Sequence, residues 1–139
     1  MTFRSILGKT VFFSLLTFVT YLTVAPNPPD SGSGMAATRM IAEALFGSAE
    51  YADKVAHFAA YLALGCSAML ADLFPRRSWA APLALALYGA ALEGVQYFVD
   101  TRAADGFDAM ANALGAVAGY AGFAIILSAA GAGRRASTE

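Results

Sequence analysis

Four blocks of mostly apolar residues, each about as long as a bilayer is thick, constrain the fold of this chain most strongly. The hydrocarbon core of a membrane is about 30 Å thick, and an α-helix crosses it with roughly 20 residues. Four segments have this length and character, at about residues 9–25, 55–73, 79–99 and 108–130. The sequence therefore predicts an all-α protein, a bundle of four transmembrane helices that forms a single membrane domain over residues 1–139.

The composition supports this expectation and excludes one class of partner. Of the 139 residues, 58% are hydrophobic and 14% are charged, whereas a soluble domain is about half apolar and about a quarter charged. The formal net charge is -1, which leaves no basic face for a nucleic-acid partner. The single cysteine, Cys66, lies in an apolar block, so we interpret it as a small packing residue.

The first apolar block has two interpretations. Because Arg4 and Lys9 precede its apolar core, it also resembles a secretory signal peptide. Pro26 follows the block directly and would occupy the first position after cleavage, which disfavours cleavage there. We expect a retained helix, with a cleaved signal as the alternative, and either one places the following loop outside the cytoplasm.

Basic residues orient the four spans, since Lys and Arg in short loops mark the cytoplasmic side of a membrane. Six of the nine basic residues fall at the N-terminus, in the loop after the second span and at the C-terminus. They are Arg4, Lys9, Arg76, Arg77, Arg134 and Arg135. These three regions share one side of a four-span protein, so we expect an N-in, C-in topology with most acidic residues on the outer side.

A short helix is expected in the first outer loop. The stretch "MAATRMIAEALFG", residues 35–47, follows a bend rich in Pro, Gly and Ser, and its apolar residues recur along one helix face. We expect a short interfacial helix that lies on the membrane surface. An ordinary solvated loop helix is the alternative.

The few polar side chains inside the last three spans form pairs spaced three or four residues apart, so each pair shares a helix face. The pairs are Asp53 with His57, Glu93 with Gln96, and Asp108 with Asn112. Because neighbouring spans run in opposite directions, all three pairs fall at one depth, in the outer third of the bundle. We expect them to line a shared polar mouth.

Among these groups, Glu93 is expected to be the least favourable to bury in the membrane. It lies seven residues before Asp100, and therefore about 10 Å inside the outer boundary. An ionised carboxylate at that depth is unfavourable by several kcal/mol unless it pairs, faces water or takes up a proton. Its candidate partners are His57, Lys54 and Arg102.

Glycines on the last span predict a close contact between helices. Gly115 lies on the same face as Asp108 and Asn112, and Gly119 lies one turn below it. Small residues at four-residue spacing let a neighbouring membrane helix approach closely.

The polar residues also form an ordered set: "DKVAHF" from Asp53, "EGVQYF" from Glu93, then Arg102, Asp108, Asn112 and Gly115. With this set the chain resembles, over residues 53–119, the VanZ-like family of small bacterial membrane proteins, named for a teicoplanin-resistance accessory. Thr101 and Ala103 replace the glycine and serine expected beside Arg102. The resemblance implies a four-helix protein of the cell envelope, in the bacterial inner (cytoplasmic) membrane, and it supplies no reaction.

Three functions fit the polar mouth. In the first, which we favour, it binds an anionic lipid headgroup or a lipophilic glycopeptide-type ligand, such as an envelope lipid intermediate or a lipoglycopeptide. In the second, the protein is a membrane-embedded hydrolase or transferase that acts on an envelope lipid. In the third, the polar groups only pair with each other and specify helix packing. Membrane lipids are the expected partners, and the oligomeric state is left open.

Each function assigns roles to particular residues. The ligand-binding set is Lys54, Gln96, Arg102, Asp108 and Asn112. In the enzyme, His57 would be the general acid or base, tuned by Glu93 or Asp53. No strong metal-ligand spacing and no nucleophile motif is present, so we predict no cofactor. A hard divalent cation on Asp53, Glu93 and Asp108 is an alternative for the enzyme.

Overall fold

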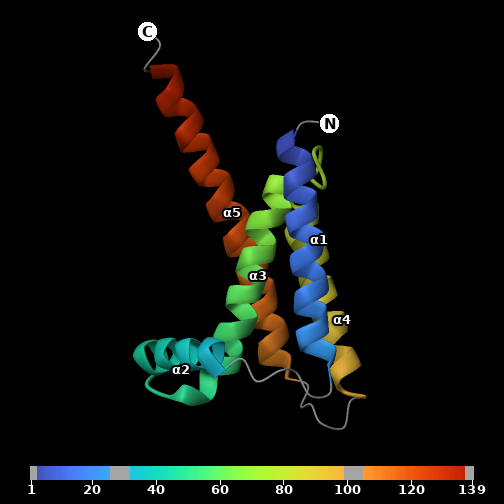
Figure 1. The fold of residues 1–139 in the computed structure, drawn as a ribbon, viewed down its shortest axis with the longest axis vertical. Coiled ribbons are helices and arrows are strands. Elements are labelled where there is room, and N and C mark those ends of the chain that lie inside the picture. Colours follow the sequence, from blue (N-terminus) through green and yellow to red (C-terminus); the bar gives the residue numbers. More distant parts are fainter. Residues whose placement is uncertain (1–2, 26–31, 99–104, 137–139) are drawn as a thin grey trace.

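Helices account for all regular secondary structure in the computed structural model, which describes residues 3–25, 32–98 and 105–136 (Figure 1). Over these residues the all-α prediction is confirmed. The elements are α1 (Phe3–Val24), α2 (Gly32–Phe46), the short 3-10 helix η1 (Ala49–Tyr51), α3 (Ala52–Ala71), α4 (Ala80–Gln96) and α5 (Gly106–Ala136).

Among the described residues, three helical stretches are long and apolar enough to cross a membrane, rather than the four expected from the sequence. They are Ser5–Val24, Ala49–Ala71 and Gly106–Ala130. The expected span 79–99 falls short because α4 has 17 residues and rises only about 25 Å. Its apolar block continues into Tyr97 and Phe98, but these residues lie in a turn after the helix and are 78% and 83% exposed. The count of apolar residues therefore overestimated the length of this helix.

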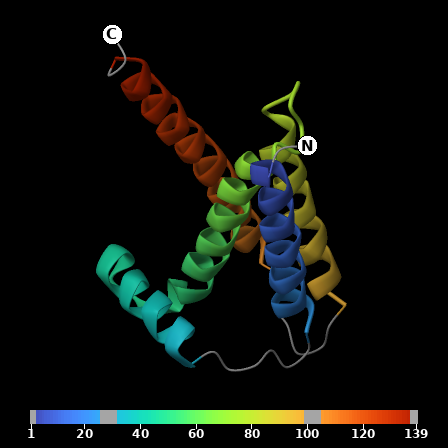
Figure 2. The ribbon, with the colours of Figure 1, turned by 45° about the horizontal axis from the view of Figure 1, so that its top comes forward.

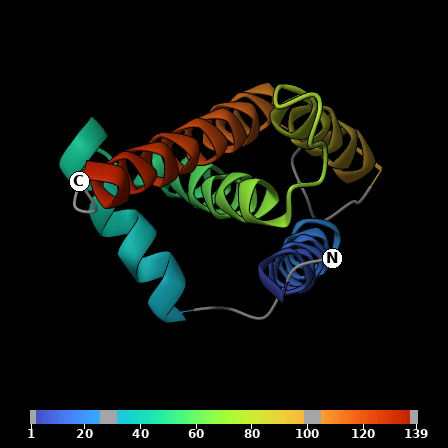
Figure 3. The same cartoon turned by 90° about the horizontal axis from the view of Figure 1, so that it is seen from above.

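The helices share one end, where the polar side chains of the sequence also fall. The C-terminal ends of α1 and α4 and the N-terminal ends of α3 and α5 lie together at the bottom of Figure 1. Seen from above, α3 lies between α1 and α5 (Figure 3). The C-terminal half of α5 projects away from the other helices (Figures 1 and 2).

Helices α3 and α5 touch through their backbones, as the glycines of the last span predict. A Cβ atom at Gly115 would collide with the carbonyl oxygen of Phe58, and one at Gly119 with that of Leu62. The Cys66 thiol donates a hydrogen bond to the Gly119 carbonyl oxygen at 3.3 Å, which places this cysteine in the same contact. The N-terminal half of α5 is thereby held beside α3.

Helix α1 is attached to α4 by polar contacts as well as by the core. The hydroxyl groups of Thr20 and Tyr88 lie 2.6 Å apart, and the Gln96 amide donates to the Thr23 carbonyl oxygen at 2.8 Å. The core that joins α1, α3, α4 and α5 includes Phe12, Val19, Tyr61, Leu64, Leu85 and Ala116.

Helix α2 occupies the place of the expected loop helix and lies across the direction of the bundle at the shared end (Figures 1 and 2). It ends at Phe46, and the next residue, Gly47, has a φ of 71°, a left-handed conformation that favours glycine. Ala42 is fully buried, whereas large apolar side chains are exposed at Met40, Ile41, Leu45 and Phe46. That α2 lies on a membrane surface stays a prediction.

The contact between α3 and α5 can be tested with two alanine substitutions on one helix. Gly119→Ala should destabilise the protein by about 1–3 kcal/mol, because the new methyl group meets the Leu62 backbone. Gly122→Ala is the control, since nothing lies within 4 Å of the added atom, and it should be neutral or slightly stabilising. Thermal unfolding in detergent measures both, and equal melting temperatures would contradict the contact.

Candidate functional site

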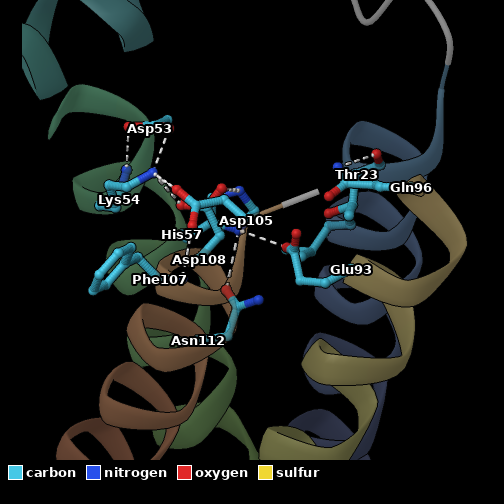
Figure 4. A network of polar contacts seen from close by, with 11 residues as sticks. Thr23, Asp53, Lys54, His57, Glu93, Gln96, Asp105, Phe107, Asp108 and Asn112 are labelled. Carbon is cyan, nitrogen blue, oxygen red and sulfur yellow. Dashed lines mark hydrogen bonds and ion pairs between the residues drawn. The ribbon is translucent and has the colours of Figure 1, made fainter. Parts of the chain in front are cut away.

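Polar side chains from α3, α4 and α5 and the residue before α5 gather at the shared end of the helices (Figure 4). We call this group the polar cluster. Its members are Asp53, Lys54, His57, Glu93, Asp105, Asp108 and Asn112.

Lys54 is the cation that joins α3 to the start of α5. Its Nζ lies 2.9 Å from Asp53 Oδ2, 2.6 Å from Asp105 Oδ2 and 3.0 Å from Asp108 Oδ1. The three carboxylates differ in burial, since the side chain of Asp53 is 48% exposed and that of Asp108 only 8%. One ammonium group therefore serves three carboxylates, of which the buried Asp108 depends on it most.

Asp105 has two partners, the ammonium group of Lys54 and the backbone N–H of Phe107. Its side chain accepts a hydrogen bond from the Phe107 backbone N–H at 2.9 Å, in the manner of a helix N-cap. The hydrogen bond from Lys54, followed by that from Phe107, lowers the pKa of the Asp105 carboxyl. Asp105 thus caps the start of α5 and also forms an ion pair with Lys54.

His57 lies between the other two helices of the cluster. Its Nδ1 lies 3.1 Å from Asn112 Oδ1, and because an amide oxygen only accepts, the ring donates that hydrogen bond. Nδ1 also lies 4.0 Å from Glu93 Oε1, and Nε2 lies 3.8 Å from Asp108 Oδ2. These two distances are too long for hydrogen bonds, so the ring is oriented by Asn112 and faces two carboxylates without bonding either.

Glu93 is a buried acid whose oxygens lack a direct partner. It is 6% exposed, and among the residues that the structure describes neither carboxylate oxygen has a hydrogen-bond partner. Buried polar groups are rarely left in this state. His57 faces it across 4.0 Å, and Arg102, a partner expected from the sequence, lies outside the described residues.

A pocket of about 400 Å³ adjoins Glu93 where α4 ends and α5 begins. It is lined by Glu93, Gly94, Tyr97, Asp105 and Gly106. Two members of the polar cluster, Glu93 and Asp105, thus form part of its wall.

The structure brings together six of the eight site residues expected from the sequence: Asp53, Lys54, His57, Glu93, Asp108 and Asn112. Asp53 is held in the cluster by Lys54, whose ammonium group binds Oδ2 and whose backbone N–H donates to Oδ1 at 2.9 Å. No contact between Asp53 and His57 is found among the described residues, although the two share a helix face. The sequence suggested Asp53, Glu93 and Asp108 as ligands for a divalent cation. In the structure, the donor atoms that lie close together are those of His57, Glu93 and Asp108.

Gln96 lies apart from the cluster, and Asp105 was missed. Gln96 is 4% exposed and its amide nitrogen donates to the Thr23 carbonyl oxygen of α1, so this amide contacts α1 rather than the polar cluster. The signal for Asp105 was the stretch "DGFD", an acidic residue in N-cap position before α5.

The apolar helices and the buried polar cluster define the class, a small helical membrane protein with a polar site at one end of its bundle. The sequence model of the VanZ/LLP1 family matches residues 9–127. The chain belongs to this family, as the resemblance over residues 53–119 indicated, and the match also includes most of α1. Comparisons with curated proteins and with solved structures gave no match.

Removing the shared cation should weaken the bundle. Lys54→Met leaves Asp105 and Asp108 facing each other without a counter-charge, and we expect a loss of about 2–3 kcal/mol in the free energy of unfolding. Asp53→Asn is the control, since Asp53 is half exposed and should contribute less than about 1 kcal/mol. Urea unfolding in detergent compares them, and an equal loss in both variants would show that Lys54 does not hold α5.

Proposed function

We propose that the chain is a single multi-pass domain of the bacterial inner (cytoplasmic) membrane that binds an envelope lipid by its anionic headgroup, or a lipophilic glycopeptide-type ligand. The pocket beside Glu93 is the observation that carries this proposal. It lies at the helix ends, where headgroups lie in a bilayer, and its wall includes the buried Glu93 and the partly exposed Asp105. Ionisable groups within membrane segments are functional candidates by default.

Charge limits how an anion could bind there. Within the described part of the cluster, four carboxylates accompany one ammonium group. An anionic headgroup would be repelled unless a further cation lies beside it. Arg102 is our proposal for one such cation, because it follows α4 by six residues in the sequence, and the ligand-binding set is then Lys54, Arg102, Asp108 and Asn112.

The proposed topology has four spans with both termini in the cytoplasm and the polar cluster at the outer face. Helix α4 would be the fourth span, since a short span is accommodated by local thinning of the bilayer at modest cost. The exposed apolar side chains of α2 support its placement on the outer membrane surface.

Filling the pocket should abolish lipid binding. In detergent, polyprenyl phosphate should raise the melting temperature of the wild type. Because Gly94 lines the pocket, Gly94→Leu should lower the affinity for polyprenyl phosphate, obtained from the same titration, at least tenfold. Gly122→Leu is the matched control, since neither glycine has an atom within 4 Å of a new Cβ. A neutral polyprenol tests the need for the phosphate. Equal responses from Gly94→Leu and the wild type would reject the pocket.

Labelling of single cysteines tests the orientation. With Cys66 replaced by Ala, Ala49→Cys changes the first residue of η1, just before α3, and Ser78→Cys changes the loop between α3 and α4; both positions are exposed. A membrane-impermeant maleimide should label Ala49→Cys in intact spheroplasts and Ser78→Cys only after lysis. The opposite pattern would reverse the proposed topology.

A further inference from the structure

We infer that His57, Glu93 and Asp108 form a binding site for a divalent first-row transition ion, such as Zn²⁺ or Mn²⁺. The three residues come from α3, α4 and α5, and one donor atom of each lies within 4.8 Å of the donor atoms of the others. No lipid is needed for this site, so it goes beyond the proposed function.

The distances within this group fit a shared ion better than direct bonds. The ring nitrogens of His57 lie 4.0 Å from Glu93 Oε1 and 3.8 Å from Asp108 Oδ2, beyond hydrogen-bond length. Ligand atoms about 2.1 Å from a tetrahedral zinc ion are about 3.4 Å apart. Because an ion takes one of the two ring nitrogens, the ligand set is one donor atom from each residue, and these atoms lie within 4.8 Å of one another. A contraction of at most about 1.4 Å per pair would bring them to coordination distance.

Glu93 supplies independent support. Its carboxylate is more than nine-tenths buried, points towards the His57 ring and has no hydrogen-bond partner among the described residues (Figure 4). Lys54, the lysine of the polar cluster, is already engaged by three other carboxylates. A buried carboxylate with neither partner nor counter-charge is strongly unfavourable, and a bound ion removes that cost.

Asn112 and Lys54 hold the other two donors in the required orientation. Asn112 accepts from His57 Nδ1 at 3.1 Å, so the lone pair of a neutral ring is at Nε2, on the side of Asp108. Lys54 binds Oδ1 of Asp108, and Oδ2 is the oxygen that faces Nε2. Metal-binding histidines commonly donate their second N–H to such an acceptor.

The donor set selects the class of ion. One imidazole nitrogen with two carboxylate oxygens suits zinc and similar ions, whereas Ca²⁺ and Mg²⁺ prefer oxygen ligands alone. Three protein ligands leave a coordination position open, and the pocket lies on the Glu93 side of the group. If the proposed function holds, a headgroup phosphate oxygen is the natural occupant of that position.

Metal binding by the full chain in detergent, with no lipid added, tests the site. After treatment with a chelator, the protein should take up about one Zn²⁺ or Mn²⁺ per chain, measured by elemental analysis, and should melt at a higher temperature with the ion bound. Mg²⁺ and Ca²⁺ should bind at least tenfold more weakly. Glu93→Gln should lower the affinity at least tenfold, and Asn112→Ala should lower it about 10- to 100-fold.

Asp72→Asn is the matched control, because this exposed carboxylate lies at the C-terminal end of α3, away from the polar cluster, and it should bind the ion as the wild type does. Without metal, Glu93→Gln should melt at or above the temperature of the wild type, which separates loss of the site from loss of the fold. Absence of tight uptake, or equal affinity in Glu93→Gln and the wild type, would overturn the inference and favour a protonated His57 between the carboxylates. Loss of lipid binding with intact metal uptake would contradict the proposed function alone.

Discussion

The backbone contact between α3 and α5 is the constraint on which the rest of the structure depends. At Gly115 and Gly119 there is no room for a side-chain atom, because the carbonyl oxygens of Phe58 and Leu62 lie where a Cβ would be. One or two turns nearer the shared end, this close approach sets the distances of Lys54 to Asp108 and of His57 to Asn112. Packing in the apolar part thus determines the geometry of the polar part.

Helix α4 adds a charge that this pair of helices does not balance. Lys54 is occupied by carboxylates of α3 and α5 and the residue before α5, so among the described residues Glu93 faces the His57 ring without a hydrogen-bond partner. A buried carboxylate in this state takes up a proton or needs a cation beside it. The proposed ion and the proposed anionic headgroup are linked by this balance, since the ion would supply the positive charge that the headgroup needs.

The sequence predicted most of the helices well, because they follow from the lengths of the apolar blocks. It also predicted that the polar groups lie near one end of the bundle, because that follows from residue spacing along each helix. It could not predict partners across helices, which depend on how each helix is rotated about its axis. Gln96 shares a face with Glu93 in sequence, yet its amide binds the Thr23 carbonyl oxygen of α1. Asp53 likewise binds Lys54 and not His57. Asp105 is the residue directly before α5, so no helical periodicity in the sequence indicates that it joins the cluster.

His57, the single histidine of the chain, faces α4 and α5 instead of lipid. Solid-state NMR of the isotope-labelled protein in bilayers tests this directly, because one imidazole gives one set of ring signals. The structure predicts magnetisation transfer from ring Nδ1 to the Asn112 side chain and from Nε2 to the Asp108 carboxyl. Transfer from the ring to lipid acyl chains, with none to either side chain, would contradict the account.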